Sequence, residues 1–398
     1  MTWIAQGIGL AACLAWAVLL VGRGFFWLAR DDDSDAEGLP EPESWPAVCA
    51  IVPARNEAET IAATVRGLTA QDYPGPLRIV VVDDRSSDGT GDLARGAGDG
   101  RLLVVTGTGK ALGWSGKLYA LQQGLEAVKA EAHEFLLFTD ADIEHSPDSL
   151  RRLVARALAD DRDLVSLMAR LRCESAAERW LIPAFVFFFQ MLYPFRWSND
   201  PGARTAAAAG GCVLLRRSAF ENRGGLLPIR GRIIDDCALA GLMKGALPEG
   251  RGAEGRGGLN RPARRSRIWL GLTERVRSLR AYDDLGTIRA MVVRTAYAQL
   301  FYNPLILLGM VAALSLVYLA PPLLAVFGDG WARGLGLLAW AAMALAYAPM
   351  LRRFGLSPLR GLALPLIATT YLAFTLDSAR AEWAGKGGLW KGEPLSRE

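Results

Sequence analysis

Short apolar runs alternate with helical stretches through the middle of the chain. Four runs consist of consecutive apolar residues, a pattern typical of strands buried in a parallel sheet. The segments between them carry helical periodicity. The series predicts a β-α-β arrangement, in which ligands bind beyond the carboxyl ends of the strands. The predicted strands are 47–53, 78–84, 101–107 and 134–142, and the predicted helices lie within 57–68, 88–98 and 116–130.

Long apolar segments lie at both ends of the chain. Residues 2–21 carry no charge and are long enough to span a bilayer, and Arg23 and Arg30 follow them. A signal peptide would need a basic start and a small-residue cleavage site, and neither is clear in this sequence. We therefore interpret residues 1–24 as an uncleaved anchor. A C-terminal membrane region is predicted at 301–380, followed by a tail at 381–398. Its apolar stretches are 304–327, 331–350 and 358–376.

Basic residues predict the orientation of these membrane segments. Arg352, Arg353 and Arg360 separate the last two stretches, and the positive-inside rule places them in the cytoplasm. The same rule places residues 25–300 in the cytoplasm. Pro321 and Pro322 leave open a re-entrant first stretch, which would change the side on which the C-terminus lies.

Three segments between the predicted elements have distinctive compositions. Residues 25–46 include the acidic run DDDSDAEGLPEPES and are predicted to be a solvated linker. Residues 180–197 are aromatic and apolar but contain prolines and Gln190, so we expect an interfacial segment in the head-group layer, with a buried core helix as the alternative. Residues 246–267 are rich in Gly, Arg and Pro and predict a flexible insertion.

Composition supports a membrane protein. Of the 398 residues 51% are hydrophobic, and the mean hydropathy is +0.18, which is apolar for a purely soluble enzyme. The net charge of +4 comes from scattered arginines, a pattern that speaks against nucleic-acid binding and is compatible with anionic lipid head groups. The five cysteines are scattered and only two histidines occur, so carboxylates must carry the polar chemistry.

Two of the predicted strands end in carboxylates. Asp83 and Asp84 close the second strand, where they can accept hydrogen bonds from a nucleobase or ribose. Asp140 and Asp142 close the fourth strand, and alternate residues of an extended segment lie on one face. They could share Mg2+ or Mn2+ and, through it, a diphosphate. A lone Asp-x-Asp is often a surface feature, but its position after a second carboxylate-tipped strand favours a site.

A further acidic pair, Asp235 and Asp236, lies between apolar residues. These flanks make a solvated loop improbable, so one carboxylate could act as a general base. The alternative is that Asp235 caps a helix N-terminus. The preceding segment, 206–220, supplies small residues that would let backbone approach a ligand closely.

The motifs VPARNEAETI (52–61), VVVDDRSSDGT (80–90), TDADI, AAAAGGCVLLRR and IIDDCALA together resemble glycosyltransferase family 2 of the inverting GT-A type. Four further segments resemble the hopene-associated glycosyltransferases found near hopanoid-synthesis genes. These segments are GWSGKLYAL (113–121), IPAFVFFFQMLYPFRW, RTAYAQL (294–300) and GKGGLWKG (385–392). The resemblance runs over nearly the whole chain.

This resemblance implies a Rossmann-like GT-A domain at 47–300 that binds a nucleotide sugar, with transmembrane helices at both ends. It assigns the nucleoside to Asp83 and Asp84, the metal and diphosphate to Asp140 and Asp142, and the base role to Asp236, with Asp235 beside it. The implied donor-binding residues also include Ala54, Arg55, Glu57, Lys117 and Arg294. Family relatives often carry a QxxRW-type motif, whereas this chain reads VVRTAYAQL, so the Arg294 role depends on position alone.

The resemblance implies an inverting hexosyl- or N-acetylhexosaminyltransferase of the bacterial inner membrane, with its catalytic domain in the cytoplasm. The acceptor would be a lipid, with a hopanoid as the specific expectation, and the donor a UDP-sugar. One alternative is a polyprenyl-phosphate sugar synthase, for which Arg216, Arg217 and Arg294 could form a basic cluster. Another is a non-catalytic membrane scaffold, which would have no physical need for the carboxylates.

Overall fold

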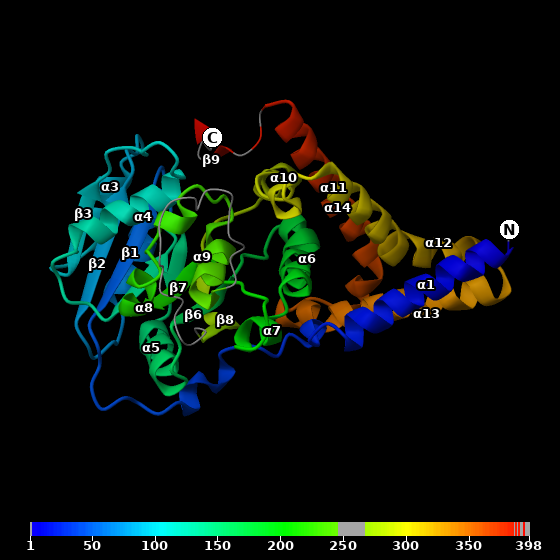
Figure 1. The fold of residues 1–398 in the computed structure, drawn as a ribbon, viewed down its shortest axis with the longest axis horizontal. Helices are drawn as coiled ribbons and strands as arrows, with labels where there is room; N and C mark the ends of the chain where they lie inside the picture. The colour runs from blue at the N-terminus through cyan, green and yellow to red at the C-terminus, as the bar shows by residue number, and fades with distance from the viewer. Residues whose placement is uncertain (1, 246–266, 386, 388, 391–392, 395–398) are drawn as a thin grey trace, which may run out of the picture. The chain divides into compact units, whose positions relative to one another are not determined.

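The computed structural model describes residues 2–245, 267–385, 387, 389–390 and 393–394, and comprises two compact units (Figure 1). The helical unit falls within Met1–Arg30, Arg172–Arg196 and Ala281–Leu389, and the sheet unit within Asp31–Leu171, Trp197–Arg280 and Trp390–Glu398. This division differs from the predicted 47–300 domain. The predicted insertion 246–267 lies outside the described residues except for Arg267, as does much of the tail 381–398.

The sheet unit is built on an eight-stranded sheet in the order β3-β2-β1-β4-β7-β6-β8-β5, counted over the described residues. Strands β1, β2, β3 and β4 pair in parallel, as predicted, whereas β7 is antiparallel to β4 and to β6. The strands are β1 (Val48–Ala54), β2 (Leu77–Asp83), β3 (Leu102–Thr106), β4 (Phe135–Thr139), β5 (Ile143–His145), β6 (Leu164–Arg170), β7 (Cys212–Arg216) and β8 (Ile268–Ser278). Two short strands, β9 (Leu389–Trp390) and β10 (Glu393–Pro394), pair separately.

Helices cover both faces of this sheet because its central strands are apolar on both sides (Figure 1). Alternate residues of β1 enter two different cores: Val48 and Ala50 pack with α2 and α5, whereas Cys49 and Ile51 pack with α4 and α9. The helices of this unit are η2 (Ser34–Gly38), α2 (Ile61–Thr69), α3 (Thr90–Ala97), α4 (Gly116–Ala127), α5 (Ser149–Ala159), α8 (Arg217–Glu221), η3 (Leu227–Ile229) and α9 (Asp235–Lys244). Helix α7 (Phe195–Asn199) spans the sequence boundary between the units.

The strand order places a ligand crevice between β1 and β4. From β1 the chain proceeds through β2 and β3 on one side, and then returns to add β4 on the other. In open α/β sheets, such a reversal separates the connections at the carboxyl ends and leaves room for a ligand. The carboxyl ends of β1, β2 and β4 carry the predicted site residues.

The acidic segment that follows the first helix packs against the sheet unit, which corrects the prediction of a solvated linker. Asp31 and Asp33 form backbone hydrogen bonds with Leu272 of β8, at 2.9 and 3.0 Å. The Asp33 side chain is buried, accepts a hydrogen bond from Thr273 at 2.6 Å and lies 3.4 Å from Arg275. Backbone pairing thus extends the sheet edge.

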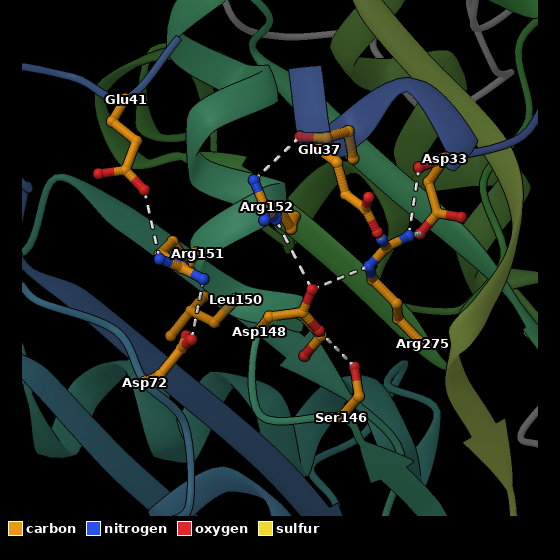
Figure 2. Close-up of polar contacts among 12 residues, drawn as sticks. Asp33, Glu37, Glu41, Asp72, Ser146, Asp148, Leu150, Arg151, Arg152 and Arg275 are labelled. Atoms are coloured by element: carbon orange, nitrogen blue, oxygen red, sulfur yellow. Dashed lines mark hydrogen bonds and ion pairs between the residues drawn. The ribbon is translucent and has the colours of Figure 1, made fainter. Parts of the chain in front are cut away.

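Arginines on α5 and β8 account for this docking. Figure 2 shows Arg275 facing Asp33, Glu37 and Asp148, with Arg151 facing Glu41. The Arg275 guanidinium lies 2.9 Å from Glu37 and 3.1 Å from Asp148. An acidic run is usually solvated, but here the fold gathers cations on two elements far away in sequence. That arrangement leaves no local signal in the acidic run itself.

The helical unit contains the apolar helices. Four described helices are long and apolar enough to cross a membrane: Trp3–Val21, Pro304–Phe327, Gly330–Arg353 and Pro358–Trp383. They match the predicted apolar stretches. The elements of this unit are α1 (Thr2–Val21), η1 (Phe26–Leu28), α6 (Ala176–Leu192), α10 (Leu285–Val293), η4 (Ala298–Leu300), α11 (Pro304–Leu314), a π-helical turn (Ser315–Leu319), α12 (Ala320–Phe327), α13 (Gly330–Arg353), η6 (Pro358–Ala363) and α14 (Leu364–Trp383).

The aromatic segment predicted at 180–197 largely forms helix α6. A capping box starts the helix: Ser175 accepts from the Glu178 N–H, and the Glu178 carboxylate accepts from the Ser175 N–H at 2.9 Å. Phe187 and Gln190 are buried, and the helix contacts α13 and α14. The packing of α6 therefore agrees with the alternative of a buried core helix. The predicted position of this segment in the head-group layer stays a prediction.

The proline pair at 321 and 322 does not interrupt the apolar helical stretch Pro304–Phe327. Proline lacks an N–H, so Pro321 cannot donate to the carbonyl of Val317 four residues earlier. A π-helical turn precedes the prolines, and the Trp16 indole N–H donates to the Val317 carbonyl at 2.9 Å. The Trp16 side chain of α1 thus supplies the hydrogen bond that Pro321 cannot donate to the Val317 carbonyl. In apolar surroundings such a carbonyl needs a partner within the protein.

We expect Arg275→Met to lower the free energy of unfolding by about 2 kcal/mol, because the buried Asp33 carboxylate loses the cation beside it. The melting temperature of the detergent-solubilised protein should fall by roughly 4 to 8 °C, measured by intrinsic fluorescence. Arg277→Met removes an exposed arginine from the same strand and serves as the control. Equal shifts in both variants would contradict the docking role of Arg275.

Candidate active site

The first predicted donor-binding residues lie on two loops that follow β1 and β2. Ala54 ends β1, and its carbonyl accepts a hydrogen bond from the Asp84 N–H at 2.8 Å. Asp84 is only 2% exposed, and its carboxylate lies 3.6 Å from Arg55 Nη1 and 3.7 Å from Arg85 Nε. Because a buried carboxylate needs charge compensation, these arginines stabilise Asp84 at the crevice.

Asp83 lies at the carboxyl end of β2, as predicted. Its Oδ1 accepts a hydrogen bond from the Ser86 N–H at 3.0 Å. A Cβ atom at Gly91 would lie 2.4 Å from Asp83 Oδ2, so a side chain at Gly91 would displace this carboxylate. Glycine at the start of α3 therefore maintains the position of Asp83.

Asp88 and Thr90 join the same two loops, a role that the sequence analysis missed. The Asp88 carboxylate accepts from the Ala58 N–H at 3.0 Å, and the Thr90 hydroxyl accepts from the Glu57 N–H at 2.9 Å. Slight burial acts to raise the pKa of Asp88, but hydrogen bonds from Thr90 and Ala58 lower it overall. The DGT sequence indicated only a turn, because the partners lie about thirty residues earlier.

Lys117 forms the centre of a charged cluster. It lies in the first turn of α4, which begins at Gly116 after the Ser115 cap. Its Nζ is 2.8 Å from Asp140 Oδ1 and 3.2 Å from Asp235 Oδ2. Burial acts to lower the pKa of Lys117, but the negative charges of Asp140 and Asp235 more than offset it, so the pKa is raised. Lys117 therefore stays protonated.

Asp236 occupies the first turn of α9. Its Oδ2 accepts a hydrogen bond from the Gly210 N–H at 3.1 Å, and its Oδ1 accepts from the Cys237 N–H at 2.7 Å. Burial and the neighbouring charge of Asp235 raise the pKa of Asp236 to about 6, although Lys117 opposes the rise. A carboxylate with such a pKa can accept a proton near neutral pH and still be mostly ionised. Asp235 begins the helix and is not its N-cap, which corrects the capping alternative.

One pocket brings these residues together. It is lined by Lys117, Asp140, Asp235 and Asp236, together with Pro53 of β1 and apolar side chains. A Cβ atom at Gly210 would lie 3.2 Å from Lys117 Nζ and 3.4 Å from the Asp236 Cβ. Gly210, one of the small residues predicted to let the backbone approach a ligand, therefore also leaves space for the side chains of Lys117 and Asp236.

The Asp140-Ala141-Asp142 motif forms a turn between β4 and β5, which corrects the expected extended segment. Its two carboxylates contact different cations: Asp140 pairs with Lys117, and Asp142 Oδ2 lies 2.8 Å from Arg280 Nε. Burial raises the pKa of Asp140, and the negative charge of Asp142 adds to the rise against Lys117. The two carboxylates are therefore close enough to interact.

The carboxylates suit a Mg2+ or Mn2+ ion if a ligand supplies further oxygen atoms. Each ion pair uses one oxygen of its carboxylate, so the second oxygen of Asp140 and of Asp142 lies outside these two pairs. Within the described ranges, no three His, Cys, Asp or Glu side chains form a group that could hold a metal. Mg2+ commonly binds through one or two carboxylates plus phosphates and water. The residues therefore fit a cation held jointly with a bound phosphate compound.

Arg294, the last predicted donor-binding residue, lies elsewhere in the chain. It is exposed at the C-terminal end of α10, in the helical unit, whereas the other predicted site residues belong to the sheet unit. Its role beside a donor stays a prediction.

The three-layer sheet unit with carboxylates at its strand ends defines an α/β domain of the GT-A type. Residues 49–224 match the sequence profile described as Glycosyl transferase family 2, so the chain carries a glycosyltransferase family 2 domain. This confirms the predicted family. The hopene-associated resemblance stays a prediction.

Two curated relatives match parts of the chain. An N-acetylglucosaminyltransferase from Mesorhizobium japonicum is 29% identical over 235 residues, covering 55% of this chain and 52% of that protein. The 4,4'-diaponeurosporenoate glycosyltransferase of Staphylococcus haemolyticus is 32% identical over 104 residues, covering 26% of each chain. The chain therefore spans about half or less of these relatives' lengths.

A solved structure supports the fold over nearly the whole chain. The mannosyltransferase PcManGT from Pyrobaculum calidifontis, in complex with GDP-Man and Mn2+, gives a TM-score of 0.53 at 22% identity. The match covers 98% of this chain and 100% of that one. It confirms the predicted GT-A fold with apolar helices at both ends.

We expect Lys117→Met to lower the free energy of unfolding by about 3 kcal/mol at pH 7.5, because Asp140 and Asp235 lose the charge between them. The loss should be smaller at pH 5.5. Lys117 opposes the raised pKa values of Asp140 and Asp236. Without it these two pKa values rise further in the folded state, and a carboxyl with a raised folded pKa favours folding as the pH falls. Melting curves at both pH values measure the difference, with the exposed Lys129→Met as control. A loss independent of pH would contradict the charge cluster.

Proposed function

We propose that the chain is an inverting membrane glycosyltransferase that transfers a sugar from a nucleotide sugar to a lipid acceptor. The observation that carries this proposal is the single pocket that joins Lys117 and Asp140 to Asp236. The first two residues suit the diphosphate side of a donor, and the third suits removal of a proton from an acceptor. The family 2 domain at 49–224 supports the same activity.

The proposed reaction is a single displacement. The acceptor hydroxyl attacks the anomeric carbon from the face opposite the nucleoside diphosphate, its proton passes to Asp236, and the bond to the diphosphate breaks. Configuration at the anomeric carbon inverts. Lys117 offers a protonated amine to the leaving phosphates, and a bound Mg2+ or Mn2+ at Asp140 and Asp142 would supply further neutralisation of their charge. Trapping a glycosyl-enzyme intermediate would exclude this scheme.

One feature of the loops supports a donor held at the β1–β4 crevice. The loops after β1 and β2 are joined by hydrogen bonds of Asp88 and Thr90, so that Ala54, Arg55, Asp83 and Asp84 are fixed before a ligand binds. We propose that Asp83 and Asp84 contact the nucleoside. The donor is proposed to be a UDP-sugar of the hexosyl or N-acetylhexosaminyl type, and the N-acetylglucosaminyltransferase relative is consistent with the latter.

The acceptor and location are argued from the apolar helices. Four candidate spans would hold the domain at a bilayer surface, where a lipid hydroxyl is available. A hopanoid is proposed as acceptor on the resemblance of residues 113–121 and 385–392. The positive-inside rule favours the cytoplasmic face of a bacterial inner membrane, where nucleotide sugars occur.

A polyprenyl-phosphate sugar synthase is the second candidate, but two of its proposed phosphate ligands lie in the wrong place. Arg216 is paired in register with Phe135, at the opposite end of β4 from Asp140. Arg216 Nη1 lies 3.0 Å from Glu134, and Arg217 Nε lies 2.7 Å from Glu221. These arginines therefore form ion pairs at the end of β4 and β7 that lies opposite Asp140. This correction leaves Arg294 as the remaining member of the predicted cluster.

Transfer of radiolabelled sugar into organic-extractable lipid tests the function. Membranes containing the protein would receive a panel that includes UDP-GlcNAc, UDP-glucose and GDP-mannose, with hopanoid or polyprenyl phosphate and with or without EDTA. We expect labelling that EDTA and Asp236→Asn each reduce, the latter by about a thousandfold. Asp92→Asn, an exposed change on α3, is the matched control. Unchanged labelling in Asp236→Asn would remove the base role, and no labelling with any donor would favour a scaffold.

The raised pKa of Asp236 predicts a pH profile. The base must be ionised to accept a proton, so kcat/KM should be constant above about pH 7 and fall as the pH drops through about 6. Initial rates between pH 4.5 and 8 would measure this, each checked for enzyme stability. A rate that stays constant down to pH 4.5 would contradict the assignment.

A further inference from the structure

Arg280 connects the Asp-x-Asp motif to the first donor-binding loop. Its Nε lies 2.8 Å from Asp142 Oδ2, and one terminal nitrogen, Nη2, lies 2.8 and 2.9 Å from the two carboxylate oxygens of Glu57. The preceding residue adds a backbone contact, because the Leu279 N–H donates to the Asp142 carbonyl at 2.7 Å. The two residues that follow β8 thus contact both the main chain and the side chain of Asp142.

The contact places a permanent positive charge beside the proposed cation site. The side chains of Asp142 and Glu57 are only 12% and 13% exposed, and that of Arg280 is 37% exposed, so water screens this contact less than it would on an open surface. Arginine keeps its charge at any pH that the protein tolerates. A divalent cation approaching the second oxygen of Asp142 would therefore meet a like charge within a few ångströms.

We infer that Arg280 is a positioning residue that weakens binding of a free divalent cation and so makes cation binding depend on the diphosphate. This inference rests on the cation site in the proposed function. Arg280 fixes the Asp142 carboxylate in place and neutralises part of its charge. A diphosphate brings negative charge that offsets Arg280, so cation and nucleotide each strengthen binding of the other, as linkage requires.

The effect of removing Arg280 on cation binding distinguishes the inferred role from that of a structural brace. A brace that only ordered Asp142 would strengthen cation binding, and its removal would weaken it. A like charge beside the site has the opposite effect, and its removal would tighten cation binding. The direction of the change therefore separates the two roles without any measurement of sugar transfer.

Mn2+ binding to the full-length, detergent-solubilised protein tests the inference, with free Mn2+ followed by electron paramagnetic resonance. We expect UDP to lower the Kd for Mn2+ at least tenfold in the wild type. Arg280→Met should lower the Kd without UDP by at least tenfold and reduce the effect of UDP. Arg280→Lys keeps the charge and should resemble the wild type.

Three controls define the result. Arg277→Met removes an exposed arginine three residues away and should leave the Kd within threefold of the wild type. Asp142→Asn should abolish the tight binding of Arg280→Met, which would place that binding at the motif. If Arg280→Met does not fold, judged by its melting curve, Arg280→Gln replaces it.

Unchanged or weaker Mn2+ binding in the uncharged Arg280 variants would overturn the inference. If the wild type still transfers sugar in that case, only the role of Arg280 fails and the proposed function stands. Absence of Mn2+ binding in every sample, with or without UDP, would also overturn the inference. The transfer assay would then decide separately whether the protein is a glycosyltransferase.

Discussion

The sheet unit gathers several carboxylates at one edge of its sheet, and the cations beside them make that arrangement possible. Lys117 lies between Asp140 and Asp235, and Arg280 lies against Asp142. Without these cations, burial and mutual repulsion of the carboxylates would destabilise the folded state. The site therefore depends on charge compensation supplied by residues far apart in sequence.

This compensation also prepares the edge for an anionic ligand. Parallel strands bring the carboxyl ends of β1, β2 and β4 together, whereas the cations come from the start of α4 and from the residue pair after β8. A diphosphate entering the crevice would compete with Asp140 for Lys117. A divalent cation bound together with the diphosphate would then compensate the Asp140 carboxylate, so that neither Lys117 nor Asp140 is left without a partner.

The sequence pattern predicted the strands and the strand-end carboxylates well, because continuous apolar runs and their ends are local features. It did not predict the partners of these carboxylates. Nothing near Arg280 in the sequence indicates Asp142, and nothing in the run at 31–44 indicates Arg275. Such pairs depend on the register of β8 with β5 and β6, which a single sequence does not contain. The predicted domain at 47–300 also differs from the division into two compact units, because α6 belongs to the helical unit.

The electrostatics of the pocket also bear on the chemistry of the acceptor. A phosphate group is largely ionised near neutral pH, so it needs no base, and the carboxylates of Asp235 and Asp236 would repel it. A lipid hydroxyl keeps its proton and needs a group that removes it during attack. In the proposed mechanism Asp236, whose pKa is raised to about 6, would meet that need while remaining mostly ionised at neutral pH. Because Arg216 and Arg217 lie at the end of β4 and β7 opposite Asp140, the charges near Asp140 are consistent with the proposed hydroxyl acceptor rather than a phosphorylated one.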